Sequence, residues 1–209
     1  MAEAWLERWQ EGRIGWHEDA GNASLRKHWR ASGRTVLVPL CGKSVDLVWL
    51  AAQGNRVIGV ELSQIAVEAF FAEQQLDFNV TDGPLRRFDA NGADVTIYCG
   101  DFMQLDDVRC DAHYDRGALV ALAAELRPGY AAHVRSLLTD DAEQLVITLG
   151  YDQAVANGPP FSIGDNEVLG YWPGLERVDR YDDTLNAPPK FLDAGLTEIF
   201  ETVWRSAAD

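Results

Sequence analysis

The stretch Val36-Leu37-Val38-Pro39-Leu40-Cys41-Gly42-Lys43-Ser44 decides the fold of this 209-residue chain. It starts with a short apolar run, which is the pattern of a buried strand, and continues into a turn at Gly42. The sequence then becomes helical from Ser44 until Gly54 stops it. This order of strand, glycine turn and helix predicts a doubly wound sheet, in which ligands bind at the carboxyl ends of the strands.

Helical periodicity recurs on both sides of this stretch. The helix after Gly42 places four apolar residues on one face: Val45, Val48, Trp49 and Ala52. Ser63 is a plausible N-cap for the helix that follows the second strand. The predicted helices are Ala2–Gln10, Asn22–Trp29, Ser44–Gln53, Ser63–Gln74, Pro128–Leu138 and Gly164–Tyr171.

Short apolar runs alternate with these helices. The predicted strands are Val36–Val38, Val57–Val60, Asp94–Tyr98, the segment around His113 and Tyr114, Leu145–Leu149, Leu175–Tyr181 and Leu196–Trp204. The last two follow each other without a long crossover helix, so we expect an antiparallel pair at the sheet edge. The alternation predicts one α/β domain, whose mostly parallel sheet is covered on both faces and ends in a β-hairpin.

Composition narrows the class of function. The formal net charge is −15, and so acidic a surface repels nucleic acid and anionic membranes. The longest unbroken apolar run, Ala118–Ala124, is far shorter than a membrane span, and the N-terminus does not have the pattern of a secretory signal. Three cysteines without metal-type spacing indicate reduced thiols, so we expect a cytoplasmic protein without a metal site.

Three strand ends carry residues suited to a nucleoside. Gly42 lets a ligand approach the backbone, and Glu61 ends the second strand 19 residues later, where an acid can accept hydrogen bonds from a ribose diol. Asp101 follows the third strand and is placed to accept from the exocyclic amine of adenine, with Phe102 packing on the ring. Each residue alone is also explained by a turn, a solvated strand end or a loop acid.

The glycine pattern selects among nucleoside cofactors. A dinucleotide fingerprint needs two further glycines, and a phosphate-binding P-loop needs a glycine where this chain has Leu37. A nucleoside that carries an amino acid instead of phosphates remains, which is S-adenosylmethionine.

Six stretches of sequence carry a resemblance to a known family. They are Trp5-x3-Trp9-x2-Gly12-x3-Trp16-His17, Pro39–Ser44, Gly59–Ser63, Tyr98–Phe102, Asp115–Leu122 and Gly158–Phe161. In these the chain resembles the thiopurine S-methyltransferase family, from Trp5 to Trp204. The resemblance implies a class I methyltransferase fold, a Rossmann-like three-layer α/β/α sandwich with seven strands. It also implies transfer of a methyl group from S-adenosylmethionine to sulfur, which leaves S-adenosylhomocysteine.

The resemblance further implies roles for individual residues. Trp5, Trp9 and Trp16 match aromatic residues over the cofactor, although the spacing of the first two also suits helix packing. Leu40 and Gly42 match the cofactor loop. Glu61 matches the ribose acid, and Asp101 and Phe102 match the adenine-side pair. Arg116 matches an arginine near the cofactor and acceptor, and we take it as the catalytic residue.

Domain organisation and partners follow from these matches. Within a single domain over 1–209, we expect an N-terminal helical lid at 1–30, a cofactor-binding core at 31–150 and an acceptor-side part at 151–209. We expect a monomer whose partner is a small thiol, or a selenium or tellurium compound. Methylation of such a compound would serve detoxification and resistance. The tail departs from better-studied members at Asp182–Pro189, which leaves the acceptor open.

Other functions compete with this interpretation. Methylation of a soft sulfur needs positioning and exclusion of water more than a base, which fits a chain without an evident catalytic dyad. A halide or simple thiol methyltransferase would share the loop and the tryptophans. A non-catalytic S-adenosylmethionine-binding module would keep Gly42, Glu61 and Asp101. A nicotinamide oxidoreductase is disfavoured by the missing glycines.

Overall fold

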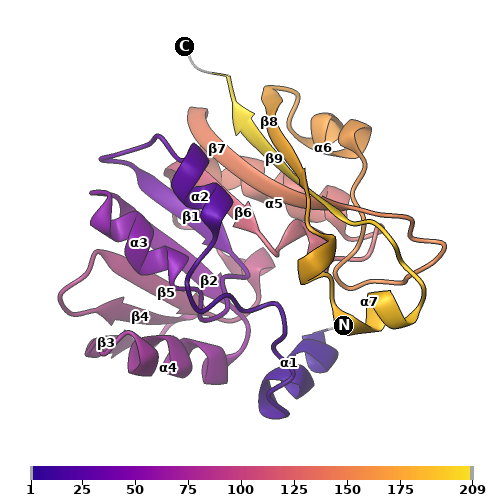
Figure 1. Cartoon of the computed structure of the whole chain (residues 1–209). Coiled ribbons are helices and arrows are strands. Elements are labelled where there is room, and N and C mark those ends of the chain that lie inside the picture. The colour runs from indigo at the N-terminus through magenta and orange to yellow at the C-terminus, as the bar shows by residue number, and fades with distance from the viewer. Residues whose placement is uncertain (1, 208–209) are drawn as a thin grey trace. The chain divides into compact units, whose positions relative to one another are not determined.

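The structure, a computed structural model, describes residues 2–207 and divides into two compact units (Figure 1). The first unit contains the chain up to Tyr114 together with Leu137–Ala142, and the second contains Asp115–Ser136 and the chain from Glu143 onwards. The expected single domain over 1–209 stays a prediction, and its residues 1, 208 and 209 lie outside the described part. No helix among the described residues has the length and apolarity needed to span a membrane.

Among the described residues, the first unit carries six strands of the sheet, four of them parallel and two in an antiparallel hairpin. They are β1 (Thr35–Pro39), β2 (Arg56–Glu61), β3 (Phe78–Thr81), β4 (Arg86–Ala90), β5 (Val95–Cys99) and β6 (Cys110–Arg116). Their order across the sheet is β3-β4-β5-β2-β1-β6, and β1 runs parallel to both β2 and β6. β2 also runs parallel to β5, with Glu61 opposite Cys99. The chain order therefore reverses beside β1, where open α/β sheets bind ligands.

Four helices belong to this unit, and α3 and α4 pack against β2 and β5 (Figure 1). They are α1 (Ala2–Gln10), α2 (Ala23–His28), α3 (Asp46–Ala52) and α4 (Gln64–Glu73). The predicted cap of α4 is confirmed, because the Ser63 side chain accepts a hydrogen bond from the Ala66 backbone. In α3 the buried face is Asp46, Leu47 and Leu50, which corrects the predicted apolar face. The helix also starts two residues later than the predicted Ser44.

A hairpin absent from the prediction extends the sheet. β3 pairs antiparallel with β4, and β4 pairs antiparallel with β5. Every residue of β3 is exposed, so it lacks the buried apolar run that identifies the central strands. The hairpin has a role at the strand ends, because Leu85 fills the space where a side chain on Gly100 would lie, 2.4 Å from an ideal Cβ.

The second unit carries antiparallel strands. β7 (Leu138–Gly150, with residues from Glu143 on in this unit) pairs with β9 (Phe200–Ser206), which pairs with β8 (Leu175–Asp182). The predicted antiparallel pair is therefore confirmed, with all seven predicted strands present among the described residues. The last strand begins at Phe200 and not at Leu196, because Leu196 and Ile199 instead fill a small core.

The helices of the second unit are short. They are α5 (Arg127–Leu137), α6 (Asp165–Tyr171), α7 (Pro189–Asp193) and two 3-10 turns, η2 (Leu119–Ala121) and η3 (Thr184–Asn186). Phe191 of α7 lies in the core with Ala156, Ala187, Leu196 and Ile199. α7 was not predicted, because five residues that begin with Pro189 show too little periodicity.

Candidate functional site

Backbone hydrogen bonds join the ends of the three central strands in the first unit. The Cys41 N–H donates to the Val60 carbonyl at 3.0 Å, and the Gly100 N–H donates to the Glu61 carbonyl at 2.9 Å. The turn after β1 is tight, since Leu40 has φ 49° and Gly42 has φ 56°. A left-handed conformation is unfavourable for leucine, and residues held in it cluster at ligand sites.

Glu61 fixes this turn with its side chain. One carboxylate oxygen accepts the Gly42 N–H at 2.8 Å, and the other accepts the Ser63 N–H at 2.7 Å. The side chain is buried, and burial raises the pKa of Glu61, an effect that the hydrogen bonds from Ser63 and Gly42 partly oppose. Each oxygen of a carboxylate has a further lone pair, so Glu61 has capacity for two more donors.

Aromatic rings cover the glycine turn. An ideal Cβ on Gly42 would lie 3.3 Å from the Trp9 ring, so the indole rests directly on the bare backbone. Trp16 lies between the other two indoles, with ring centroids 5.1 Å from Trp5 and 5.9 Å from Trp9, both edge to face. The structure therefore brings together the three predicted tryptophans, and we call Trp5, Trp9 and Trp16 the indole cluster.

Asp101 and Phe102 follow Gly100 at the end of β5. Asp101 is exposed, and its carboxylate caps the 3-10 turn η1 (Phe102–Gln104) by accepting the Met103 N–H at 3.0 Å. Phe102 is buried in that turn. The exposed carboxylate has free lone pairs, so Asp101 combines the structural role of a loop acid with capacity for a ligand.

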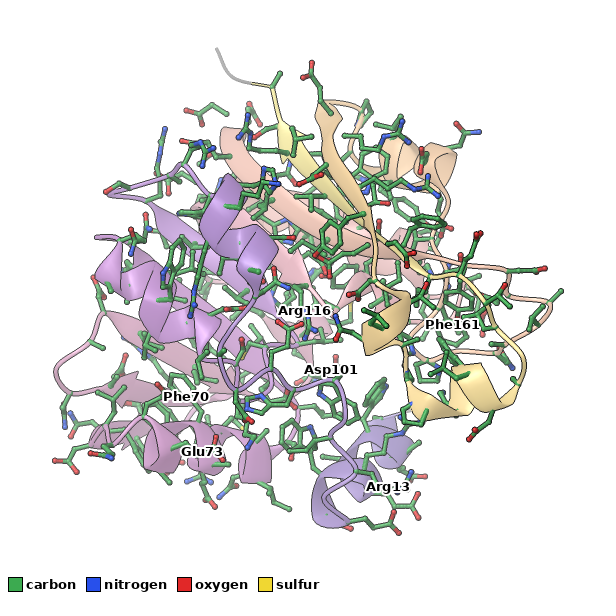
Figure 2. All side chains as sticks on the ribbon, viewed as in Figure 1. Arg13, Phe70, Glu73, Asp101, Arg116 and Phe161 are labelled. Atoms are coloured by element: carbon green, nitrogen blue, oxygen red, sulfur yellow. The ribbon has the colours of Figure 1, made fainter. Side chains whose placement is uncertain are left out.

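Residues near Gly42 have structural partners. Lys43 forms an ion pair with Glu73 of α4. Figure 2 labels Glu73 on this helix and Asp101 at the strand ends. Burial raises the pKa of Cys41 well above the ordinary thiol value, and the nearby Glu61 raises it further. Burial also raises the pKa of Cys99. These thiols stay protonated at neutral pH and are poor nucleophiles.

Sequence reasoning missed a buried polar anchor in the first unit. The Asp46 carboxylate accepts the Asn22 N–H at 2.8 Å and the Tyr114 hydroxyl at 2.9 Å. Asn22 caps α2 at the end of the segment that follows Trp16, and Trp29 packs edge to face on Tyr114. The one local signal for this anchor is Asp46, an Asp near the start of a predicted helix.

Arg116 ends β6 in the second unit. Its neighbour Asp115 is fully buried and accepts the Leu119 N–H at 3.1 Å and the Tyr130 hydroxyl at 2.7 Å. Burial raises the pKa of Asp115 to about 6, against the hydrogen bonds from Tyr130, Leu119 and Ala118. Asp115 therefore holds the turn that carries Arg116, and both of its oxygens are occupied by groups other than that arginine.

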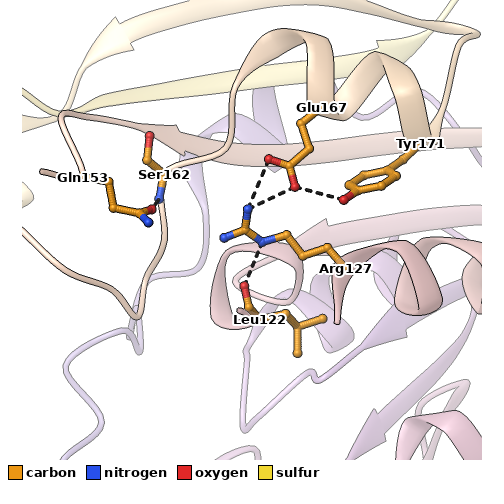
Figure 3. Close-up of polar contacts among 6 residues, drawn as sticks. All are labelled: Leu122, Arg127, Gln153, Ser162, Glu167 and Tyr171. Carbon is orange, nitrogen blue, oxygen red and sulfur yellow. Dashed lines mark hydrogen bonds and ion pairs between the residues drawn. The ribbon is translucent and has the colours of Figure 1, made fainter. Parts of the chain in front are cut away.

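A second missed cluster surrounds Arg127 in the same unit (Figure 3). The buried guanidinium contacts both oxygens of Glu167 at 3.0 and 3.1 Å, and its Nε donates to the Leu122 carbonyl at 2.8 Å. It also lies 5.4 Å from the Phe161 ring, and the Phe161 N–H donates to the Val120 carbonyl at 2.6 Å. Arg127 thus ties the segment after η2 to α6 and to the loop that contains Pro159 and Pro160.

Comparison with known sequences identifies relatives of nearly full length. The family model described as Thiopurine S-methyltransferase (TPMT) matches residues 1–208. A thiopurine S-methyltransferase of Bordetella petrii is 46% identical over 214 residues, which cover 98% of this chain and 97% of that protein. One from Pseudomonas fluorescens is 41% identical over 216 residues, which cover 98% of this chain and 96% of that protein.

Solved structures share the fold at low sequence identity. A methyltransferase from Burkholderia thailandensis, solved with 1,6-didemethyltoxoflavin and S-adenosylhomocysteine, has a TM-score of 0.62 at 18% identity, covering 99% of this chain and 87% of that one. An S-adenosylmethionine-dependent methyltransferase from Anabaena variabilis has a TM-score of 0.63 at 14% identity, and the match covers 99% of this chain and 95% of that one. The class I methyltransferase fold is thereby confirmed.

Proposed function

The chain belongs to the thiopurine S-methyltransferase family, and from this membership we propose that it methylates the sulfur of aromatic and heterocyclic thiols. It is an S-adenosylmethionine-dependent methyltransferase. When bound, S-adenosylmethionine supplies an electrophilic methyl group on a sulfonium. The observation that carries the proposal of sulfur as acceptor is the indole cluster on Gly42, because a soft nucleophile needs a dry, aromatic enclosure more than a base.

The residues at the strand ends fit an adenosine cofactor. Gly42 has φ 56° and no Cβ, and a side chain there would press on the Trp9 ring, so the turn requires a glycine for the indole to rest on it. Glu61 has two spare lone pairs at the end of β2, where an acid can accept from a ribose diol. We assign Leu40 and Gly42 to the cofactor loop and Glu61 to the ribose.

Asp101 and Phe102 complete the proposed nucleoside site. The exposed Asp101 carboxylate can accept from an exocyclic amine, and the hydrogen bond from Gly100 to Glu61 holds the turn before it at the end of β2. Phe102 is fixed in η1 and offers an apolar contact for a base. These contacts orient the ligand, while methyl transfer itself requires no proton from either residue.

The indole cluster acts in this proposal as a lid. Indole faces attract a cationic sulfonium by about 0.5–2 kcal/mol and exclude water from it. The two edge-to-face contacts of Trp16 make the three rings one body, so they close or open together. The Asp46 anchor holds Asn22, at the end of the segment after Trp16, against β6 and α3.

Arg116 is proposed as the catalytic residue, because its guanidinium can orient an anionic acceptor. Thiolates and the oxyanions of selenium and tellurium are such acceptors, and their methylation would serve detoxification and resistance. We also propose that the enzyme is a cytoplasmic monomer, without nucleic acid or membrane partners. Its three cysteines are free, and the net charge of −15 supports this proposal.

A matched acceptor panel tests this function. Thiophenol and 6-mercaptopurine are each compared with the hydroxyl analogue, phenol or hypoxanthine, and with selenite, tellurite, bisulfide and iodide. We expect methylation of both thiols and none of the hydroxyl compounds. Arg116→Ala should lower turnover of anionic acceptors more than that of neutral ones.

Two other results would contradict the proposal and identify the alternative function. Faster turnover of iodide or bisulfide than of either aromatic thiol would make the chain a halide or simple thiol methyltransferase. Tight binding of S-adenosylhomocysteine without turnover of any acceptor would make it a binding module.

A further inference from the structure

A cavity of about 410 Å³ opens within the second unit, and none of the individual residues proposed to bind the cofactor or to take part in methyl transfer lines it. Its floor is one face of the β7-β9-β8 ladder. Gly150 pairs with Phe200, and Arg180 pairs with Thr202, so the four residues share that face. The space exists because Gly150 has no side chain and Thr202 is small, while the segments 162–165 and 195–198 form the walls.

Arg180 is the one basic residue that lines the cavity. Its guanidinium lies 4.8 Å from the Phe200 ring, and its terminal nitrogen is 4.0 Å from an ideal Cβ on Gly150. Among residues 2–207 this guanidinium has no hydrogen bond or ion pair, although the chain has 33 acidic residues. A guanidinium that lies over an aromatic ring keeps its fork of N–H donors available for a carboxylate.

The acidic groups that line the cavity indicate which other charged group a ligand there would carry. Asp165 is neutralised by Arg177 at 2.6 Å, and Asp152 accepts only the Ala154 N–H. Glu198 has no hydrogen bond or ion pair in the described part of the chain. Two uncompensated carboxylates would repel a simple anion, but they suit a ligand that brings its own ammonium group.

Apolar side chains complete the lining. Tyr151, Val155, Ile163, Leu196 and Phe200 face the same space, whose volume is in the range of small-molecule sites. We propose that this cavity binds a free amino acid with a large apolar side chain. Its carboxylate contacts Arg180, its ammonium group contacts Glu198 and Asp152, and its side chain packs against the apolar wall. The inference does not rest on the proposed methyl acceptor.

Calorimetry on the full chain with L-phenylalanine tests the proposal, with saturating S-adenosylhomocysteine present so that the cofactor site is filled. The matched ligands are 3-phenylpropanoate, which lacks the ammonium group, and phenethylamine, which lacks the carboxylate. We expect L-phenylalanine to bind at least about tenfold more tightly than either. Equal affinities, or no binding of L-phenylalanine at millimolar concentration, would overturn the proposal.

Three variants locate the binding. Arg180→Gln should weaken L-phenylalanine binding about tenfold, and Gly150→Leu should abolish it by filling the cavity. Arg135→Gln is the control, since Arg135 contacts the Tyr171 carbonyl and does not line the cavity. Unchanged affinity in Arg180→Gln would place the ligand elsewhere, whatever Gly150→Leu does. Methyl transfer measured in the same samples should be unchanged by Arg180→Gln, which separates this inference from the proposed function.

Discussion

The Glu61 carboxylate accepts the backbone N–H of Gly42 at 2.8 Å, across 19 residues of sequence. This bond connects the end of β2 to the turn after β1, and it sets the position of the glycine on which Trp9 rests. The acid proposed to bind the ribose therefore also shapes the loop proposed to bind the rest of the cofactor. Loss of the carboxylate affects both.

Replacement of Glu61 by alanine should weaken S-adenosylhomocysteine binding by about 1–3 kcal/mol, because the Gly42 and Ser63 N–H groups lose their acceptor. Calorimetry gives the affinity. Glu61→Gln should lose less, since an amide oxygen still accepts one of these bonds. Glu68→Ala, on the exposed side of α4, is the control and should bind normally. Equal affinity of the wild type and Glu61→Ala would remove Glu61 from the site.

Trp16→Ala should lower kcat/KM for methyl transfer by about tenfold or more, because it removes both edge-to-face contacts of the indole cluster. The measurement is steady-state kinetics, with thermal unfolding to show that the fold is intact. Trp49→Ala in α3 removes another half-buried indole and should leave the rate unchanged. If both variants lose the same activity, the cluster is only a packing element.

Asp115 should titrate with a pKa of about 6, compared with 3.8 for an ordinary Asp. Carbon-detected NMR of its carboxyl group measures this directly. Tyr130→Phe should raise the pKa further, because the hydroxyl hydrogen bond favours the ionised form. Tyr151→Phe, whose hydroxyl contacts the Pro160 carbonyl, should leave it unchanged. A value near 3.8 in the wild type would contradict the burial of this carboxyl group.

The same shift predicts a pH dependence of stability. Because the folded pKa is raised, the protonated form is favoured by folding, and the contribution of Asp115 is complete below pH 3.8 and lost as pH rises through about 6. Between pH 4 and pH 7 the free energy of unfolding should therefore fall by about 2 kcal/mol relative to Asp115→Asn. Urea unfolding at both pH values measures the difference, and parallel curves for the two proteins would refute it.

Arg127→Gln should cost about 2–3 kcal/mol of unfolding free energy, because it leaves the partly buried Glu167 without its cation and frees the Leu122 carbonyl. Chemical denaturation measures the loss. Arg135→Gln, on the exposed side of the same helix, is expected to cost under about 1 kcal/mol. A loss that small for Arg127→Gln would mean that the cluster in Figure 3 does not organise this unit.

Local signals predicted the frame of the molecule well. The buried strands β1 and β2 contain continuous apolar runs, and Ser63 caps α4 as its position indicates. The positions of Gly42 and Glu61 at neighbouring strand ends also follow from the sequence, because spacing and topology alone place them there. These features depend on short stretches of chain whose chemistry is visible without tertiary partners.

The missed features depend on partners far away in the sequence. Tyr114 meets Asp46 across 68 residues, and Arg127 meets Glu167 across 40, so neither pair has a local pattern. β3 was missed because its residues are exposed on both faces. The role of the hairpin depends on a tertiary contact, in which Leu85 fills the space beside Gly100. Tertiary packing, rather than propensity, decides such elements.

The most direct test of the account is a crystal structure of the protein with S-adenosylhomocysteine. We predict the ribose hydroxyls within hydrogen-bond distance of the Glu61 carboxylate, the adenine beside Asp101 and Phe102, and the indole cluster over the sulfur. A nucleoside bound away from these strand ends, with the Glu61 carboxylate still held only by the amides of Gly42 and Ser63, would contradict it.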